Sequence, residues 1–281
     1  MAVSEDYMKL ITFSVDGRQR IGEVEGDTVY SLAWQDSMRQ MIRRSLVAGR
    51  AYERFPLDKV TIHAPLMPGK ILAIGLNYAD HAKETGKEPP AAPLIFAKLT
   101  SAVVGPHEPI TWRESISHEV DYEGELAVII GRRAKDVPEA EAMDHVFGYT
   151  CANDISARDI QFGPDGQWTR AKGLDTFCPL GPWIVTKAEI ADPHALKLKT
   201  QLNGKKMQDG TTADMVFKIP ALIAYISKHI TLEPGDAILT GTPAGVGRAR
   251  KPAVYLKDGD KVTVHIEGIG DLANPCRVLP D

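Results

Sequence analysis

The sequence predicts a mainly β fold of the α+β class, and three observations carry this expectation. Short strand-like runs outnumber helical runs along the chain, and no regular strand–helix alternation supports a parallel, doubly wound sheet. The 24 glycines and 19 prolines cluster in turn-like groups, as expected where strands are joined by tight connections. We therefore expect strands linked by short turns, with few and short helices.

Composition and charge exclude several classes of protein. The 281 residues are 43% hydrophobic and 25% charged, ordinary globular values that argue against a disordered or fibrous chain. The formal net charge of −4 argues against a nucleic-acid partner, because such binding relies on clustered Lys and Arg. No apolar run approaches the roughly 20 residues that span a bilayer, and no signal peptide is visible. Three widely spaced cysteines without a C-x-x-C motif favour a reducing, cytoplasmic location.

The first part of the chain predicts a small β-rich domain over residues 1–66. Alternating runs separated by Asp-Gly and Gly-Asp turns predict three strands, at 9–15, 21–24 and 28–30. Apolar residues at helical spacing predict an amphipathic helix within 32–52, with its arginines facing solvent. Prolines 65 and 68, together with Gly69, then mark the boundary to a larger domain over residues 67–281.

The larger domain is predicted to consist of strands interrupted by short helices. Buried apolar runs predict strands at 70–75, 94–98, 102–104, 126–130, 183–186, 196–202, 237–240 and 261–267. Helical spacing predicts helices at 78–85, 138–147, 155–161 and 219–229. The glycine-rich segment 241–247 lacks the Lys of a P-loop, so a nucleotide site is not expected there.

Glu123 and Glu125 stand two residues apart in a predicted strand, so their side chains share one face. Neighbouring carboxylates repel each other unless a positive charge lies between them. A hard divalent cation such as Mg²⁺ or Mn²⁺ would supply that charge, and it prefers oxygen ligands. An exposed strand edge with solvated acids would give the same spacing, so this pattern alone leaves both alternatives open.

A second polar segment lies where a predicted strand turns into a helix. Asp154, Arg158 and Gln161 stand at i, i+4 and i+7, which places them on one helical face. Asp154 could add a third oxygen ligand, while Arg158 and Gln161 could bind a substrate carboxylate. An N-capping Asp with a surface ion pair fits the same spacing.

The predicted helix 78–85 carries His81 and Glu84 at i, i+3. A carboxylate beside an imidazole orients the ring and raises its basicity, which suits a general base that activates water. An ordinary pair of residues on a surface helix would show the same spacing.

Six segments in a fixed order resemble the fumarylacetoacetate hydrolase family, in particular its bacterial members of similar length. They extend from about residue 68 to the C-terminus. The segments are GLNYADHAKE, VDYEGELAVIIG, GYTCANDISARDIQ, GQWTRAKGLDTFCPLGPWIV, LEPGDAILTGTPAGVG and KDGDKVTVHIEGIGDLANP. Their number and order make the resemblance specific, whereas any one of them alone would be weak.

This resemblance implies a mixed β-sandwich roll with a small N-terminal domain, and a homodimer. It implies that Glu123, Glu125 and Asp154 are the ligands of Mg²⁺ or Mn²⁺. His81 and Glu84 would form the catalytic dyad of a lid helix. The resemblance also implies that Lys172 is a catalytic lysine. The residues that it implies as substrate contacts are Tyr78, Arg158, Gln161 and Thr242.

Two positions depart from the pattern of the family. Leu76 stands where mammalian acylpyruvase-like members carry Arg, which removes one anchor for a distal acid. Gly173 and Leu174 stand where many relatives have Ser-Phe. Both differences concern the substrate more than the metal.

The activity that the resemblance implies is metal-dependent hydrolysis of a C–C bond in a 2,4-dioxo acid, such as an acylpyruvate, to pyruvate-type products. His81, oriented by Glu84, would deprotonate the attacking water, and Lys172 with the metal would stabilise the enolate. Oxaloacetate decarboxylation and isomerisation of a hydroxymuconate-type acid are alternatives that reuse the same site. A metal-dependent binding module is a third alternative, against which the dyad argues, because a binder needs no base.

Overall fold

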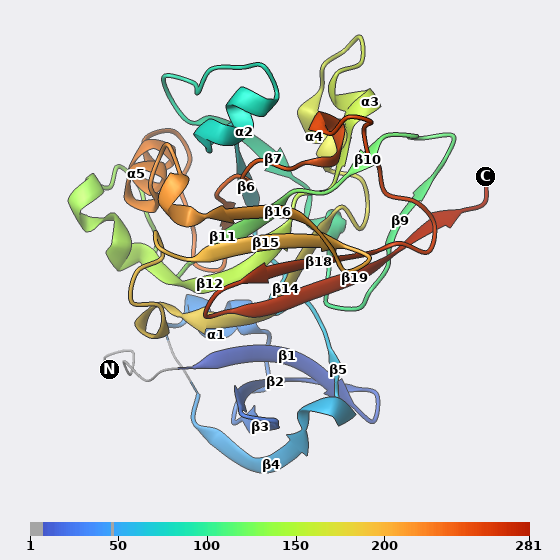
Figure 1. The fold of residues 1–281 in the computed structure, drawn as a ribbon. Helices are drawn as coiled ribbons and strands as arrows, with labels where there is room; N and C mark the ends of the chain where they lie inside the picture. The colour runs from blue at the N-terminus through green and yellow to red at the C-terminus, as the bar shows by residue number, and fades with distance from the viewer. Residues whose placement is uncertain (1–7, 46–47) are drawn as a thin grey trace.

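The computed structural model describes residues 8–45 and 48–281 of the chain. Strands dominate it and helices are short, as the sequence predicts (Figure 1). Within the described residues the strands form a 12-stranded sheet, a 5-stranded sheet and a 2-stranded ribbon. No helix in this part of the chain is long and apolar enough to cross a membrane.

The large sheet is mixed and begins at the N-terminal strands. In the order of hydrogen-bonded neighbours, its strands are β4 (Arg50–Pro56), β3 (Thr28–Leu32), β2 (Arg18–Glu25), β1 (Lys9–Val15), β14 (Cys178–Thr186), β12 (Val146–Asn153), β11 (Gly124–Ile130), β17 (Ala237–Leu239), β6 (Ile71–Gly75) and β7 (Leu94–Lys98). Two short strands, β5 (Thr61–Ile62) and β8 (Val103–Val104), pair with β1 and β14. The pairs β17–β6 and β8–β14 are parallel, while the neighbours along the rest of the sheet are antiparallel.

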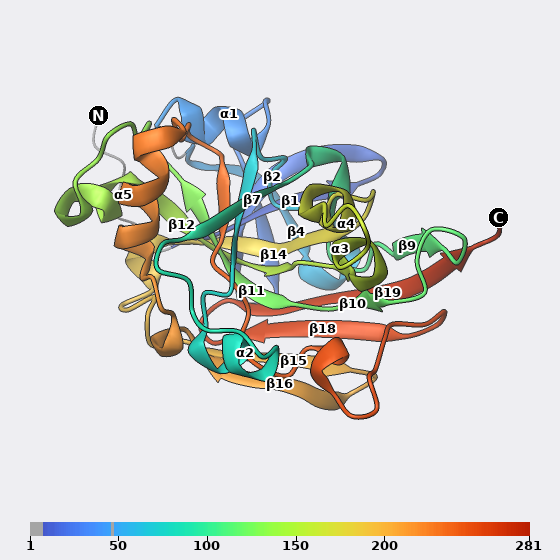
Figure 2. The same cartoon turned by 90° about the horizontal axis from the view of Figure 1, so that it is seen from above.

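The smaller sheet covers one face of the large sheet. Its strands, in order, are β16 (Lys205–Thr211), β15 (Lys197–Leu202), β18 (Lys261–Ile266), β19 (Gly270–Leu279) and β9 (Ile110–Arg113). The ribbon pairs β10 (Val120–Asp121) with β13 (Ser156–Ala157). The helices are α1 (Met38–Arg43), α2 (Ala79–Glu84), α3 (Arg158–Gln161), α4 (Trp168–Lys172) and α5 (Ile219–His229). Helices α2, α3 and α4 lie at the end of the molecule opposite the N-terminal strands (Figures 1 and 2).

Strand β11 is buried on both faces and forms the centre of the core. Leu126, Val128 and Ile130 pack in the cluster that includes α5 and the smaller sheet. Ala127 and Ile129 pack in the cluster that includes α1. A strand that is buried on both faces needs a nearly continuous apolar run, and this is why the sequence of β11 shows no alternation after Glu125. The two layers therefore hold the start of β11 rigidly.

The predicted helix within 32–52 is too long, because only α1 is helical and residues 50–56 form β4. Residues 46–47 lie outside the described part of the chain, as do the first seven, on which the expected absence of a signal peptide partly rests. Strand β4 pairs with β3, and Arg50 bonds Glu23 at 2.7 Å across the sheet. These cross-strand contacts outweigh the helical spacing. The predicted helix 138–147 is a 3₁₀ helix that ends where β12 begins.

The N-terminal strands continue the large sheet, since β1 pairs with β14 through Lys9 opposite Val185 and Leu10 opposite Ile184. The division of the chain into domains 1–66 and 67–281 stays a prediction, as does the homodimer.

Candidate active site

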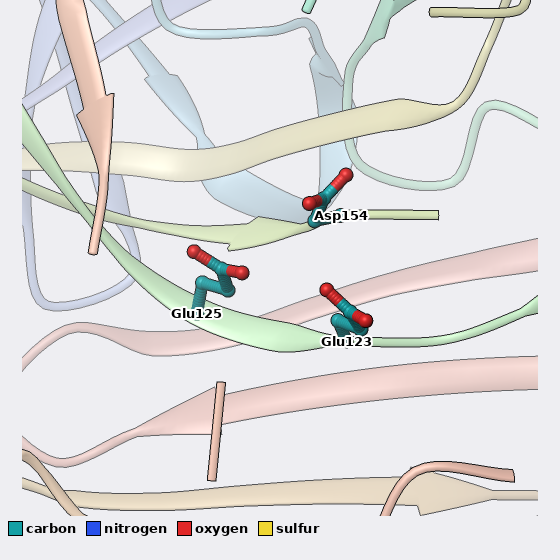
Figure 3. Close-up of side chains that lie close together, drawn as sticks. All are labelled: Glu123, Glu125 and Asp154. Atoms are coloured by element: carbon teal, nitrogen blue, oxygen red, sulfur yellow. The ribbon is translucent and has the colours of Figure 1, made fainter. Parts of the chain in front are cut away.

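The three predicted metal ligands converge in the structure. Ligand oxygens of Glu123, Glu125 and Asp154 all lie within 4.8 Å of one another, and all three side chains are buried (Figure 3). Glu123 directly precedes β11 and Glu125 lies within it, so alternation along the strand turns both to the same side. Asp154 follows the neighbouring strand β12, and its N–H donates to the carbonyl of Glu123 at 2.8 Å. Two adjacent strand ends therefore build the cluster.

The prediction that Asp154 shares a helical face with Arg158 and Gln161 is wrong for Asp154. Helix α3 begins only at Arg158, and the two residues before it form β13, which pairs with β10. Arg158 and Gln161 do face each other, with Nη1 donating to Oε1 at 2.9 Å. Asp154 comes from the end of β12 instead, and its partners are Lys98 and Lys172.

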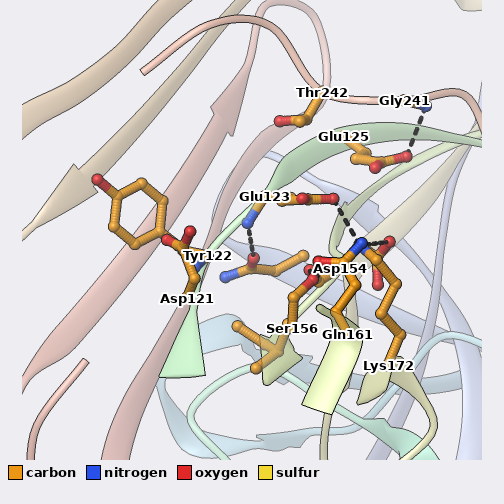
Figure 4. A network of polar contacts seen from close by, with 12 residues as sticks. Asp121, Tyr122, Glu123, Glu125, Asp154, Ser156, Gln161, Lys172, Gly241 and Thr242 are labelled. Carbon is orange, nitrogen blue, oxygen red and sulfur yellow. Dashed lines mark hydrogen bonds and ion pairs between the residues drawn. The ribbon is translucent and has the colours of Figure 1, made fainter. Parts of the chain in front are cut away.

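Two buried lysines lie among the acids. Lys172 Nζ donates to Glu123 Oε2 and Asp154 Oδ2, both at 2.8 Å, and to Ser156 Oγ at 2.7 Å (Figure 4). Lys98 Nζ donates to Asp154 Oδ1 at 2.5 Å. Burial alone would lower the pKa of Lys172. The negative charges of Asp154 and Glu123 raise it by more than burial lowers it, so the pKa lies above its ordinary value. All three donors of Lys172 are used within the cluster, and it stays a charged group between two of the expected ligands.

Arg158 connects the cluster to a fourth buried acid. Its Nε donates to Asp121 Oδ2 at 2.9 Å, and its Nη1 lies 2.7 Å from Glu123 Oε1. Burial would lower the pKa of Arg158, but Glu123 and Asp121 hold it above its ordinary value. Among the described residues Nη2 is buried and has no hydrogen-bond partner. The two N–H groups of Nη2 are therefore left for a ligand.

Glu125 differs from the other acids because no cationic side chain is bonded to it in the described part of the chain. Its Oε2 accepts the N–H of Gly241 at 2.6 Å. Burial, Asp154 and Glu123 together raise the pKa of Glu125 well above its ordinary value. The buried acids of the cluster are Asp121, Glu123, Glu125 and Asp154, and the buried cations are Lys98, Arg158 and Lys172. One carboxylate is thus uncompensated, and a cation with a preference for oxygen ligands, such as Mg²⁺ or Mn²⁺, fits this set.

The predicted dyad also forms. His81 Nδ1 lies 2.9 Å from Glu84 Oε1 on α2, which favours the tautomer with the proton on Nδ1 and leaves Nε2 as an acceptor. Glu84 Oε2 accepts the N–H of Gly245 at 2.9 Å, and Asp80 Oδ2 accepts the N–H of Ala244 at 3.2 Å. Helix α2 is therefore bound to the glycine-rich loop that follows β17.

The glycine-rich loop 241–248 donates backbone N–H groups to acids from several segments. Besides the contacts to Glu84 and Glu125, the N–H groups of Gly247 and Arg248 donate to Asp121 at 2.8 and 3.0 Å. Gly241 adopts a φ of +95°, and a Cβ there would lie 2.8 Å from that of Asn77, so only glycine fits. The loop thus uses its N–H groups on carboxylates of the protein itself.

One cavity of about 390 Å³ is lined by residues of the acid cluster, the dyad and the glycine-rich loop, while Asp154 is not part of its lining. The predicted site residues that line it are His81, Glu84, Glu123, Glu125, Arg158, Gln161, Lys172 and Thr242. Thr242 Oγ1 donates to the carbonyl of Gly124 at 2.8 Å, which holds the loop against β11. Phe96 and Trp168 form part of an apolar wall, with ring centroids 5.3 Å apart.

Tyr78 is the predicted substrate contact that does not line this cavity. It pairs with Met215 in an isolated β-bridge, and its side chain is fully buried in the core cluster with α5. Tyr78 therefore belongs to the core cluster and not to the cavity lining.

Sequence reasoning missed Lys98, Asp121 and the N–H donors of the loop. Asp121 stands two residues before Glu123, so the alternation used for Glu123 and Glu125 could have included it. Lys98 ends an apolar strand, and such a lysine is buried only with a partner. The backbone donors carry no signal in the side-chain pattern.

A family model described as fumarylacetoacetate (FAA) hydrolase C-terminal matches residues 70–277, which include the whole acid cluster and the dyad. The chain belongs to the fumarylacetoacetate hydrolase family. The predicted resemblance is thereby confirmed, and the protein is an enzyme of this superfamily with a buried acid triad that suits a divalent metal.

Relatives in the family carry different activities in their names. Oxaloacetate tautomerase fahd2, mitochondrial, of Xenopus laevis is 51% identical over 220 residues, which are 78% of this chain and 69% of that protein. The structure of fumarylacetoacetate hydrolase from Exiguobacterium antarcticum is 40% identical, with a TM-score of 0.88 over 97% of this chain and 100% of that chain. The structure of 2-hydroxyhepta-2,4-diene-1,7-dioate isomerase from Mycobacterium marinum is also 40% identical, with a TM-score of 0.84 over 98% and 100%. The predicted fold is confirmed over nearly the whole chain.

Proposed function

We propose that the protein moves a proton on a 2-oxo acid, interconverting its keto and enol forms, with Mg²⁺ or Mn²⁺ held by Glu123, Glu125 and Asp154. The observation that carries this proposal is that His81, oriented by Glu84, lines the same cavity as Glu123 and Glu125. The names of two relatives, an oxaloacetate tautomerase and a dioate isomerase, support a proton shift more than a hydrolysis.

The residues of the chain divide the work of such a proton shift. When bound, a divalent cation supplies Lewis acidity toward the carboxylate and 2-oxo oxygens of the acid. His81 Nε2 accepts the proton from the carbon next to the oxo group and returns it to the oxygen, so protons and charge balance over the reaction. The free Nη2 of Arg158 orients the carboxylate. The apolar wall with Phe96 and Trp168 limits access of water.

Lys172 and Gln161 support this arrangement. The ammonium of Lys172 is held at the cluster by Glu123 and Asp154, where its charge favours a developing enolate. Direct donation from Lys172 to the substrate requires one of its three present hydrogen bonds to be exchanged. Gln161, bonded to Arg158, keeps the guanidinium in place.

A second candidate is hydrolysis of the C–C bond in a 2,4-dioxo acid such as an acylpyruvate. The dyad favours it, because an imidazole with a carboxylate partner can equally remove a proton from water. The name of the hydrolase from Exiguobacterium antarcticum supports hydrolysis, although on a different dioxo acid. Decarboxylation of oxaloacetate is a third reaction of such a site, and it needs the electron sink but no base.

One set of assays distinguishes the candidates. Purified protein with Mg²⁺ is mixed with oxaloacetate in D₂O, and exchange at C3 is followed by NMR while ultraviolet absorbance reports the enol. Parallel assays measure pyruvate from acylpyruvates and CO₂ from oxaloacetate. If the proposal is correct, proton exchange at C3 is faster than the release of pyruvate or CO₂, and it is well above the rate measured with His81→Ala. A higher kcat/KM for pyruvate release would move the assignment to hydrolysis, and CO₂ release without exchange would move it to decarboxylation.

A further inference from the structure

Gln208 is a buried residue of the smaller sheet to which the proposed reaction gives no role. It lies in β16, is 1% exposed and is not part of the cavity lining. Its Oε1 accepts the N–H of Gly124 at 2.9 Å. Its Nε2 donates to Thr242 Oγ1 at 2.7 Å and to the carbonyl of Pro243 at 2.8 Å. The amide thus joins the start of β11 to the glycine-rich loop.

These hydrogen bonds form a closed ring. Thr242 Oγ1 accepts from Gln208 and donates its own proton to the carbonyl of Gly124 at 2.8 Å. The N–H and the carbonyl of Gly124 are therefore both bound, the first by an amide and the second by a hydroxyl. A flipped amide would set NH₂ against the N–H of Gly124 and oxygen against the carbonyl of Pro243, so the orientation of the amide is fixed. Every donor of the ring faces an acceptor, and a satisfied buried network is rigid.

The ring takes the place of a missing strand beside β11. Strand β12 pairs with Gly124 on one side, but β17 pairs only with residues 127–129 on the other and ends at Leu239. In the described part of the chain, Gly124 thus has no strand neighbour on this second side. Its buried backbone groups still require partners. A glutamine amide offers the same donor and acceptor as a peptide group, and Gln208 with Thr242 supplies what the next strand would.

Gly124 needs this support because it separates the two glutamates of the acid cluster. A Cβ at this position would lie 2.2 Å from Thr200 Oγ1, so only glycine fits. Glycine is the least restrained residue in a backbone, and here it stands between Glu123 and Glu125. On the side of β12 the N–H of Glu123 donates to Asn153 Oδ1 at 3.0 Å. On the other side the ring is what restrains the backbone between the two ligands.

We propose that Gln208 is a positioning residue of the metal site, which holds Glu123 and Glu125 at a fixed spacing through Gly124 and so favours Mg²⁺ over larger cations. This inference rests on the proposed function, which places a divalent cation at the acid cluster. Mg²⁺ requires near-ideal octahedral geometry with oxygens at about 2.0–2.1 Å, whereas Ca²⁺ accepts variable geometry at about 2.3–2.6 Å. A rigid pair of ligands therefore selects the smaller ion, and a looser pair selects less.

Calorimetric titration of the full-length, metal-free protein with Mg²⁺ and, separately, with Ca²⁺ tests the proposal. Gln208→Met nearly keeps the length of the side chain and removes the amide. Its affinity for Mg²⁺ should fall about 10-fold, as is usual when a partner of the metal ligands is lost. Its affinity for Ca²⁺ should fall less, so that the preference for Mg²⁺ over Ca²⁺ drops about 3-fold or more. A loss of fold stability alone would not change this ratio.

Thr242→Val opens the same ring at a different bond. It should weaken Mg²⁺ binding and the preference over Ca²⁺ in the same direction, and it decides the question if Gln208→Met does not fold. The double variant should lose little more Mg²⁺ affinity than the single variant with the larger loss, because either change opens the ring.

Asn274→Leu is the matched control. Asn274 of β19 is also 1% exposed, and its Nδ2 donates to the carbonyls of Gly105 and Glu108 at 2.8 and 2.9 Å, outside the cavity lining. This variant should lose stability but keep both metal affinities. Three results would each overturn the proposal: wild-type Mg²⁺ affinity in both ring variants, an equal loss of Mg²⁺ and Ca²⁺ affinity, or the same loss of preference in Asn274→Leu.

Proton exchange at C3 of oxaloacetate, measured separately, distinguishes this inference from the proposed function. If the wild type binds Mg²⁺ with a preference that depends on Gln208 but exchanges no proton, the positioning role stands and the proposed reaction is rejected. If the wild type exchanges protons and the ring variants bind Mg²⁺ as the wild type does, the proposed reaction stands and the role of Gln208 is rejected.

Discussion

Lys98 Nζ lies 2.5 Å from Asp154 Oδ1, and the side chains of both residues are fully buried. The same ammonium group donates to the backbone carbonyls of Lys172 and Ile155. One lysine at the end of β7 therefore orients an expected metal ligand and holds the end of α4, the helix that carries Lys172. We regard Lys98 as a positioning residue, because it acts through Asp154 and Lys172.

Lys98→Met should lower the free energy of unfolding of the metal-free protein by about 3 kcal/mol, because it removes one partner of a buried ion pair. Mg²⁺ should stabilise this variant more than the wild type, since a dication replaces the missing charge beside Asp154. Denaturant titration with and without Mg²⁺ measures both effects. Lys70→Met, which removes the half-buried partner of Asp236, is the control. An equal Mg²⁺ effect in Lys98→Met and the wild type would contradict the assignment.

Glu125→Gln should abolish Mg²⁺ binding and turnover without lowering the free energy of unfolding of the metal-free protein. Its carboxylate has two acidic neighbours, Glu123 and Asp154, that disfavour its charge. The amide oxygen can still accept the N–H of Gly241. Glu123→Gln and Asp154→Asn should also lose Mg²⁺, but with a loss of stability. Glu123 pairs with both Lys172 and Arg158, and Asp154→Asn leaves the buried Lys98 without an anionic partner among the described residues. Calorimetry measures the Mg²⁺ affinity of each variant, and unfolding curves measure its stability. If Glu125→Gln bound Mg²⁺ as tightly as the wild type, Glu125 would not be a metal ligand.

His81→Ala should reduce proton exchange at C3, and any acylpyruvate hydrolysis, by about 10²-fold or more, the usual contribution of a general base. Oxaloacetate decarboxylation should survive to a larger degree, because the acid cluster is untouched. The activity of Glu84→Gln should lie between those of the wild type and His81→Ala, since this change weakens the orientation of the imidazole and the hydrogen bond to Gly245. These effects are measured as kcat/KM for each reaction in the wild type and both variants. The Mg²⁺ affinity of each protein is the control. Near wild-type exchange in a metal-competent His81→Ala would assign the base elsewhere.

Arg158→Lys should raise KM for 2-oxo acids sharply while Mg²⁺ affinity changes little. A lysine keeps the positive charge beside Asp121 and Glu123 but cannot provide the fork of donors, including the Nη2 that has no partner among the described residues. Steady-state kinetics on the folded variant tests this. An unchanged KM would limit Arg158 to its ion pairs with the two acids.

The stability of the fold should fall in mild acid through His194. Its Nε2 accepts the N–H of Ile219 at the start of α5, at 3.1 Å, and burial holds its pKa below the ordinary value, while Asp192 opposes this and Lys218 adds to it. The folded state thus binds fewer protons than the unfolded chain, so this contribution is complete above the unfolded pKa of about 6.5 and is lost as the pH falls below it. His194→Gln should lose less stability than the wild type between about pH 7.5 and pH 5.5. If denaturant titrations showed that the wild type and His194→Gln lose the same free energy of unfolding over this pH range, this role of His194 would be rejected.

Local signals predicted those elements whose structure is determined by neighbouring residues. The helix 219–229 and the strands 9–15 and 94–98 have the bounds expected from their spacing and apolar runs. Strand β19 was missed because Gly, Asp, Asn and Pro275 are poor strand residues. It forms because β18 and β9 pair with it on both sides, which is a contact that the local sequence does not contain.

The candidate site also contains some residues that local spacing predicts and others that only distant contacts bring in. The acid pair and the dyad have short spacings that a strand or a helix converts directly into proximity. Lys98 reaches Asp154 across 56 residues, and its sequence neighbours show only an apolar strand. The departure of Asp154 from the expected helical face has a similar origin, since the pairing of β13 with β10 delays the start of α3.

The hydrogen bonds of the glycine-rich loop span long stretches of chain. Gly241 and Glu125 are 116 residues apart, Gly245 and Glu84 are 161, and Ala244 and Asp80 are 164. Closing such long loops costs conformational entropy, and contacts of high sequence separation slow folding. During synthesis, a nascent chain can already contain the dyad and every carboxylate of the cluster. It acquires a working site only after residues 241–248 have emerged and docked, so catalytic competence is one of the last properties that this chain gains as it folds.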